Sequence, residues 1–122
     1  MKVYVSAPWI DVSLANAAAG ALTGAGFRVV SRWHDLSLWN EHRALGIQAV
    51  RDLEDLWDAD ALLLLNTRLS EGKAVEFGWA LSHHLHLVVV GTRSDANIFH
   101  YLPEVTMVPT VTAAIEFLRG VD

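Results

Sequence analysis

Apolar and polar positions along the chain form short blocks with two different periods. Runs of β-branched, leucine and aromatic residues predict strands at residues 2–7, 27–31, 61–65, 85–90 and 105–108. Between them, apolar residues recur at helical spacing over residues 12–25, 41–59, 73–84 and 112–119. Residues 32–40 have no clear period and are expected to form a loop or lid. Asp11 or Ser13 can begin the first helix, and Gly24 and Gly26 can end it.

Strands that alternate with helices predict right-handed crossovers and a parallel sheet covered on both faces. The uninterrupted apolar run at residues 61–65 is typical of a central, fully buried strand. We therefore expect one α/β domain over residues 1–122, a flavodoxin-like three-layer α/β/α sandwich with a five-stranded parallel sheet. Ligands bind such sheets where the strand order reverses, which predicts a pocket built from residues 6–9 and 66–76.

Composition narrows the possible partners. With 122 residues, of which 52% are apolar, the chain can bury one core, and its net charge of -5 without a Lys/Arg cluster argues against nucleic-acid polymers. The absence of cysteine excludes disulfides and thiolate metal sites. No apolar run is long enough to span a bilayer, and the N-terminus does not resemble a signal peptide, so the expected location is the cytoplasm. His83, His84 and His86 are explained by a helix C-terminus, and no metal or cofactor is predicted.

The segment from Ser70 to Ala80 carries the strongest chemical signal. Serine and glycine at the start of a helix leave backbone N-H groups free to meet an anion, and Glu76 follows about one turn later. Gly78 inside the helix costs about 1 kcal/mol relative to alanine, which suggests close approach by a ligand or another backbone. The alternative is a surface glutamate stabilised by the helix dipole, beside a glycine tolerated for packing.

Four pieces of the sequence together resemble the nucleoside 2-deoxyribosyltransferase family, which includes deoxynucleoside 5'-monophosphate N-glycosidases. They are VYVSA at residues 3–7, DLEDLWDAD at residues 52–60, the pattern Ser70-x-Gly-x-x-x-Glu76-x-Gly-x-Ala80, and LVVVG at residues 87–91. The resemblance implies that Glu76 is a covalent nucleophile, that Tyr4 orients its carboxylate, and that Asp52 acts near the leaving base. Without the resemblance, Asp52 would be interpreted as an exposed helix residue paired with a nearby Arg or Lys. Tyr4 would be interpreted as an aromatic residue of the core with its hydroxyl hydrogen-bonded.

Such chemistry needs a carboxylate beside the sugar. Departure of a base leaves positive charge on the anomeric carbon, which a carboxylate can stabilise and capture as a glycosyl ester. Attack by water on the ester makes the protein a hydrolase, and attack by another base makes it a transferase. Asp52 is our hypothesis for the acid that protonates the leaving base.

Ser70 bears on the substrate. In the family that the sequence resembles, members that use free nucleosides share an acidic residue six positions before the nucleophile. The nucleotide hydrolases of that family have serine at this position. Ser70, with Gly72 and the neighbouring N-H groups, is therefore expected to accept a 5'-phosphate, and Lys73 to add positive charge. The alternative is that Ser70 only caps the helix. Ser6 is expected to line the same pocket.

The remaining candidates lie in loops. Trp9, Trp33 and Trp39 are expected at the pocket rim, where one of them stacks on the base, although tryptophans in a small domain also fill the core. His34 is a weaker candidate for contacting base or phosphate. The resemblance implies that residues 97–101 lend a residue, His100 or Asn97, to a neighbouring subunit's site. Because the domain is small and apolar, we expect a homodimer or higher homo-oligomer, and the alternative is that this loop only closes its own monomer.

Two other classes of function are compatible with an α/β domain of this size. A non-catalytic nucleotide-binding module would keep the pocket without the chemistry, and it remains the alternative to an enzyme. A flavodoxin-like or response-regulator-like signalling domain is disfavoured, because the first strand is followed neither by an acidic pair nor by a flavin-type phosphate loop.

Overall fold

The computed structural model describes residues 1–38, 45–93 and 97–122, and in it five parallel strands form one sheet. The strands are β1 (Lys2–Ser6), β2 (Arg28–Val29), β3 (Ala61–Leu65), β4 (His86–Val90) and β5 (Val105–Val108). Their order in the sheet is β2-β1-β3-β4-β5. This is the flavodoxin-like order, so the predicted architecture is confirmed. The strand order reverses between β1 and β3.

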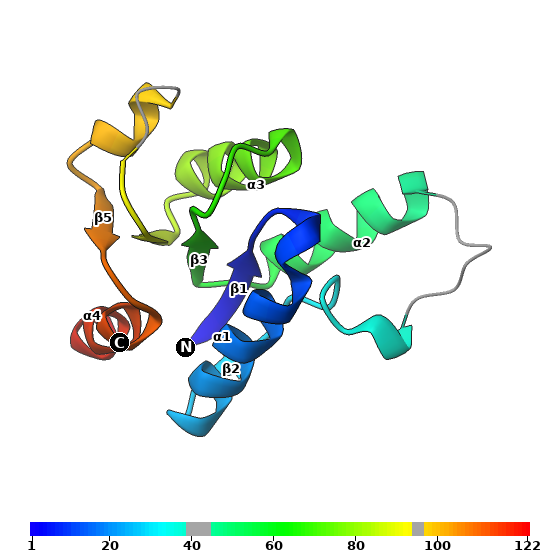
Figure 1. The fold of residues 1–122 in the computed structure, drawn as a ribbon, viewed down its shortest axis with the longest axis horizontal. Coiled ribbons are helices and arrows are strands. Elements are labelled where there is room, and N and C mark those ends of the chain that lie inside the picture. Colours follow the sequence, from blue (N-terminus) through cyan, green and yellow to red (C-terminus); the bar gives the residue numbers. More distant parts are fainter. Residues whose placement is uncertain (39–44, 94–96) are drawn as a thin grey trace.

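Helices cover both faces of the sheet, as Figure 1 shows. They are α1 (Val12–Gly24), α2 (Leu45–Trp57), α3 (Glu71–Ser82) and α4 (Val111–Val121). The helices α1 and α4 contact each other on one face, and α2 and α3 contact each other on the opposite face. Three short 3-10 turns, η1 (Trp9–Asp11), η2 (Leu36–Leu38) and η3 (Ile98–Tyr101), lie in the connections.

The central strands form the core because they are apolar on both faces. All five residues of β3 are buried, as are the last four of β1 and the central residues of β4. A strand covered by helices on both sides is apolar at nearly every position, which is why the run at residues 61–65 predicts β3 correctly. Within the described parts of the chain, no helix is long and apolar enough to cross a membrane.

The edge strand β2 is shorter than the sequence predicts. The backbone N-H of Val30 still donates to the Val3 carbonyl at 2.9 Å. At the next position the hydroxyl of Ser31, not a backbone carbonyl, accepts from the Val5 N-H at 3.0 Å. A side-chain hydrogen bond thus takes the place of the next backbone hydrogen bond between β1 and β2. The chain therefore leaves the sheet after two paired residues.

The predicted helix starts also need correction. Asp11 occupies the N-cap position of α1 but makes no capping bond with its side chain, because its carboxylate accepts from Thr67 at 2.5 Å and from Arg68 at 3.1 Å. The helix α3 begins at Glu71, two residues earlier than predicted, since Ser70 caps it. The predicted start of the second helix at residues 41–44, and residues 39–40 of the predicted lid, lie outside the described residues.

Candidate active site

A cavity of about 450 Å³ opens beyond the carboxyl ends of β1 and β3, where the strand order reverses. Its lining comes from the loop after β1, from the loop before η2, from α2 and from the start of α3. The lining residues are Ala7, Trp9, Trp33, Gln48, Ala49, Asp52, Leu53, Ser70, Gly72, Lys73, Val75 and Glu76. Both predicted loops therefore contribute to one pocket, and α2 adds a third wall.

Glu76 lies in this cavity with both carboxylate oxygens hydrogen-bonded. Its Oε2 accepts from the hydroxyl of Tyr4, and its Oε1 accepts from the hydroxyl of Ser6 at 2.9 Å. Tyr4 and Ser6 are two residues apart on β1, so they point to the same face of the sheet, and both are fully buried. The contact between Tyr4 and Glu76 is the one that the family resemblance implies.

The surroundings of Glu76 in the cavity bring its pKa close to neutral pH. Burial raises the pKa of Glu76 to about 7, although the hydrogen bonds from Tyr4 and Ser6 favour the ionised form. The negative charge of Asp52 contributes to this rise. Burial and the same carboxylates raise the pKa of Tyr4, so the phenol keeps its proton and acts as a donor. A carboxylate poised in this way can change its charge near neutral pH.

Asp52 approaches the cavity from α2. It is half-buried, and its Oδ1 accepts from the amide of Gln48 at 2.8 Å. Burial raises the pKa of Asp52, and the hydrogen bond from Gln48 opposes the rise. Its hydrogen-bond partner is thus an amide one helical turn away, which differs from the exposed ion pair considered as the alternative. A carboxyl with a raised pKa can carry a proton to a leaving group.

The start of α3 forms the polar end of the cavity. Ser70 Oγ accepts from the Lys73 backbone N-H at 3.3 Å, so Ser70 does cap the helix. The N-H groups of Glu71 and Gly72 belong to the first turn, which has no intrahelical acceptors. Ser70 and Gly72 both line the cavity, as predicted. Capping and anion binding are therefore compatible here.

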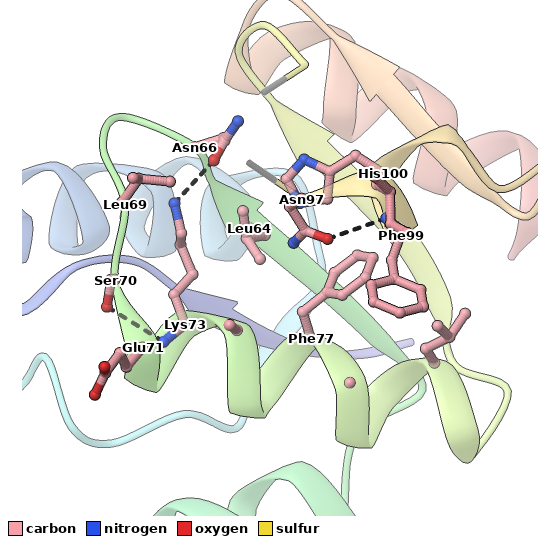
Figure 2. A pocket seen from close by; sticks show the side chains of 14 residues that line it. Leu64, Asn66, Leu69, Ser70, Glu71, Lys73, Phe77, Asn97, Phe99 and His100 are labelled. Atoms are coloured by element: carbon pink, nitrogen blue, oxygen red, sulfur yellow. Dashed lines mark hydrogen bonds between the residues drawn. The ribbon is translucent and has the colours of Figure 1, made fainter. Parts of the chain in front are cut away.

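Lys73 is directed differently from its predicted role. The side chain is buried, and its Nζ donates to Asn66 Oδ1 at 2.8 Å (Figure 2). The same Nζ donates to the Arg68 carbonyl at 2.5 Å. Burial lowers the pKa of this amine. Lys73 lines the cavity, but its ammonium group holds the loop between β3 and α3.

Aromatic residues divide between rim and wall. Trp9 is 55% exposed at the rim, while Trp33 is buried in the wall and donates its indole N-H to the Val5 carbonyl at 2.7 Å. Their ring centroids are 6.2 Å apart. Trp39 lies outside the described residues. Trp9 is therefore the better placed of the two to meet a ligand ring.

Two predicted histidines lie elsewhere. His34 is buried with Nε2 at 2.8 Å from Ser31 Oγ and Nδ1 at 2.8 Å from Asn16 Oδ1, so both ring nitrogens are used inside the protein. His100 lines a second cavity with Asn97, not the cavity of Glu76 in the same chain. Among the described residues, no cluster of three or more His, Asp or Glu side chains could hold a metal ion.

Sequence reasoning did not find the polar contacts that fix these walls. Arg32 donates to Asp55 from its backbone at 3.1 Å and from Nε at 2.9 Å, which ties the loop after β2 to α2. The Asp11 carboxylate likewise accepts hydrogen bonds from Thr67 and Arg68, which ties the loop after β3 to the start of α1. The spacing of Gln48 four residues before Asp52 was the one local signal, since such pairs meet on a helix surface.

Comparison with known proteins supports the fold. The sequence matches no protein-family model and no curated protein. A 2-deoxyribosyltransferase from Bacillus psychrosaccharolyticus has a TM-score of 0.68 at 16% identity, covering 94% of this chain and 90% of its own. A conserved protein from Enterococcus faecalis V583 has a TM-score of 0.76 at 13% identity, covering 100% and 99%. A CMP N-glycosidase from Clostridium botulinum has a TM-score of 0.63 at 13% identity, covering 98% of each chain.

These likenesses define a class by its fold. The chain has the fold of the 2-deoxyribosyltransferase and the CMP N-glycosidase over nearly its whole length. This is the fold that the sequence resemblance implies. Because a fold hosts many chemistries, the activity of this chain has to be argued from its own site.

Proposed function

We propose that this protein is an enzyme that cleaves the N-glycosidic bond of a nucleoside 5'-monophosphate or nucleoside, with Glu76 as covalent nucleophile. One observation carries the proposal: a carboxylate at the strand-order reversal has both oxygens hydrogen-bonded, by Tyr4 and Ser6, and a pKa of about 7. Two proteins of the same fold are described as a 2-deoxyribosyltransferase and a CMP N-glycosidase, which agrees with this chemistry.

In the first step, the bond between the anomeric carbon and the base nitrogen breaks, and its electron pair leaves with the base. A Glu76 oxygen forms the new bond to the anomeric carbon. Each carboxylate oxygen has a second lone pair, so the hydrogen bonds from Tyr4 and Ser6 leave it able to attack. Those bonds fix the carboxylate in one orientation, which lowers the entropic cost of reaching the transition state.

Asp52 supplies the proton that the leaving base needs. Burial raises the pKa of Asp52, which makes it a better acid than a solvated carboxyl. When Asp52 is ionised, its charge raises the pKa of Glu76 in turn, so the two carboxyls lie close enough to interact. In the second step, water or an acceptor base attacks the anomeric carbon of the ester and releases Glu76 as a carboxylate. Asp52, deprotonated in the first step, accepts the proton of the incoming nucleophile.

The proposed binding site for the 5'-phosphate is the start of α3. Ser70 and the N-H groups of Glu71 and Gly72 offer donors there, and the helix dipole favours an anion at this end. Glu76 follows Ser70 by six residues, roughly 9 Å along the helix axis. Trp9 at the rim is the proposed platform for the base.

A chromatographic assay tests the proposal. The protein is incubated with a panel of nucleosides and 5'-monophosphates, with and without a free acceptor base. Release of base from monophosphates supports a hydrolase, and exchange onto the added base supports a transferase. The Glu76→Gln variant is expected to fold and to lose at least about 10³-fold in kcat.

Glu116→Gln is the matched control, because Glu116 is an exposed glutamate on α4, on the other face of the sheet. It should keep native activity. If Glu76→Gln is as active as the control, Glu76 is not the nucleophile. Tight binding of a nucleotide that is recovered intact would instead support a binding module.

We also propose that the protein forms a homodimer. The helix α2 exposes large apolar residues, among them Leu45, Ile47, Val50 and Trp57, and Val75 on the adjacent α3 is exposed as well. An apolar surface of this kind on a small domain is typical of a subunit interface. Because Leu53 and Val75 also line the cavity of Glu76, a second subunit on this surface would lie next to the site.

A further inference from the structure

A second cavity, of about 580 Å³, lies against the face of α3 that carries Phe77 (Figure 2). Ala74, Phe77, Gly78 and Leu81 line it at helical spacing, whereas Glu76 lines the first cavity. One helix therefore separates two cavities. A cavity of this volume is large enough for a small organic ligand.

The two cavities adjoin at the start of α3. Ser70 and Lys73 line both of them. A phosphate held by the first-turn N-H groups would therefore have the Glu76 cavity on one side and the second cavity on the other. A substrate that ends at its 5'-phosphate would use only the first.

The lining of the second cavity suits a flat ring. Leu64 and Phe77 line it, together with Phe99 of the turn η3 and Asn97, the residue that caps this turn (Figure 2). His100 is only 2% exposed, and within the described parts of the chain its Nδ1 is the buried side-chain polar atom without a hydrogen-bond partner. Apolar walls with a few polar groups are typical of sites for heteroaromatic ligands.

Gly78 points to the same use. A Cβ atom built on this glycine would meet nothing within 4 Å, so no neighbouring group in the chain requires a glycine there. Glycine is also a poor residue for a helix interior. Keeping this face of α3 bare leaves room for a group that packs directly on the helix.

From these observations, which rest on the proposed function, we infer that the substrate continues past its 5'-phosphate into the second cavity. The class that fits is a dinucleotide, in which a pyrophosphate joins the cleaved nucleoside to a second one. The cavity runs along α3 from Lys73 to Leu81, roughly 12 Å, which is about the length of a nucleoside.

The charges that line the second cavity favour a substrate whose second half is neutral. Glu71 and Lys73 both line this cavity, but the Lys73 ammonium already donates to Asn66 and to the Arg68 carbonyl, so additional phosphates placed near Glu71 would be repelled. A pyrophosphate diester carries no more charge than a phosphate monoester, and the nucleoside beyond it is uncharged. A dinucleotide is therefore preferred over a nucleoside triphosphate.

Substitution of Gly78 tests the inference. Gly78→Leu fills the second cavity, and it is expected to fold, because leucine is a better helix former than glycine. Gly20→Leu is the matched control, since Gly20 is an exposed mid-helix glycine on α1, with open space around it on the other face of the sheet. Activity is measured on a 5'-monophosphate, a dinucleoside pyrophosphate and a nucleoside triphosphate of the same base.

The native protein should show a kcat/KM at least about tenfold higher for the dinucleotide than for the other two substrates. Gly78→Leu should lower this preference about tenfold, and Gly20→Leu should keep it. A native preference for the monophosphate or triphosphate overturns the inference. A Gly78→Leu variant that keeps the dinucleotide preference also overturns the inference. If that variant changes only the oligomeric mass, a second copy of the chain fills the cavity, and the inference is again wrong.

Binding separates this inference from the proposed function. In the Glu76→Gln background, calorimetric titration should give a lower Kd for the dinucleotide than for the monophosphate, and Gly78→Leu should remove the difference. If monophosphates are cleaved in a Glu76-dependent way while the dinucleotide is neither cleaved nor bound more tightly, this inference alone fails. If no substrate is cleaved or bound, both fail.

Discussion

Glu76 is held between opposing influences that suit a nucleophile. Burial favours its neutral form, while the hydrogen bonds from Tyr4 and Ser6 favour the carboxylate, and the balance leaves a pKa of about 7. A nucleophile that ionises near neutral pH keeps more intrinsic reactivity than a fully solvated carboxylate. The same arrangement makes the ionised side chain a source of instability.

Replacing Glu76 should therefore stabilise the protein at high pH. The pKa of Glu76 in the folded state, about 7, lies above its ordinary value of 4.5, so its contribution to stability is lost as pH rises between these values. Glu76→Gln should raise the free energy of unfolding by roughly 1–3 kcal/mol at pH 8 and by much less at pH 4.5. Urea unfolding at both pH values measures the difference. An equal effect at both would contradict the assigned pKa.

Asp52 should shape the pH dependence of activity. Turnover needs Glu76 ionised and Asp52 protonated, so kcat/KM of the native protein should be bell-shaped, with limbs that belong to the coupled pair. Asp52→Asn removes the acid and also the negative charge that raises the pKa of Glu76. This variant should be slower and keep only the rising limb, with its midpoint below 7. A persistent falling limb would assign the acid role to another group.

At the scale of elements, α3 combines several functions along one helix. Its capped first turn offers anion donors, one face carries Glu76, and the opposite face lines the second cavity. The side chains that ionise or bind lie on the first two turns, near the positive end of the helix dipole. A change at Ser70 should therefore affect helix stability and phosphate binding separately.

Substitutions at Ser70 should separate capping from phosphate binding. Ser70→Ala should cost about 1 kcal/mol of stability, whereas Ser70→Asp should keep the cap, because aspartate is a good N-cap residue. Ser70→Asp should nevertheless raise KM for a 5'-monophosphate by about tenfold or more, since it places negative charge beside the phosphate. Steady-state kinetics and thermal unfolding provide the two readouts.

The control is Thr110, which caps α4 through a hydrogen bond from the Ala113 N-H at 3.1 Å. Thr110→Ala should lose a similar stability, about 1 kcal/mol, with KM unchanged. If Ser70→Asp leaves KM for the monophosphate unchanged, the phosphate does not bind at the start of α3.

At the scale of the whole molecule, the apolar surface of α2 and α3 predicts assembly. Val50 on α2 is exposed and does not line the cavity of Glu76. Val50→Glu would place a charge in the proposed interface, so light scattering should show a shift from dimer to monomer. Leu14→Glu is the control, because Leu14 is a comparably exposed apolar residue on α1, on the other face of the sheet. A monomeric native protein would contradict the proposal.

The sequence determined the architecture because the spacing of apolar residues along the chain follows directly from which positions are buried. The strands β3 and β5 begin and end at the predicted residues, and α1 and α4 differ by one or two positions. It also placed Ser70, Gly72 and Glu76 correctly at one sheet edge, since parallel strands must end on the same side. Local patterns suffice where an element's own side chains decide its environment.

Only the tertiary structure decided which polar groups meet. The family resemblance implies the contact of Tyr4 with Glu76, but the contact of Ser6 joins residues 70 positions apart, and no local period encodes such a pairing. The early end of β2 depends on Ser31 reaching Val5, and the direction of Lys73 depends on Asn66. The position of His100 in the second cavity depends on how η3 packs against α3. Hydrogen-bond partners and cavities are properties of packed surfaces, and those surfaces exist only once the chain has folded.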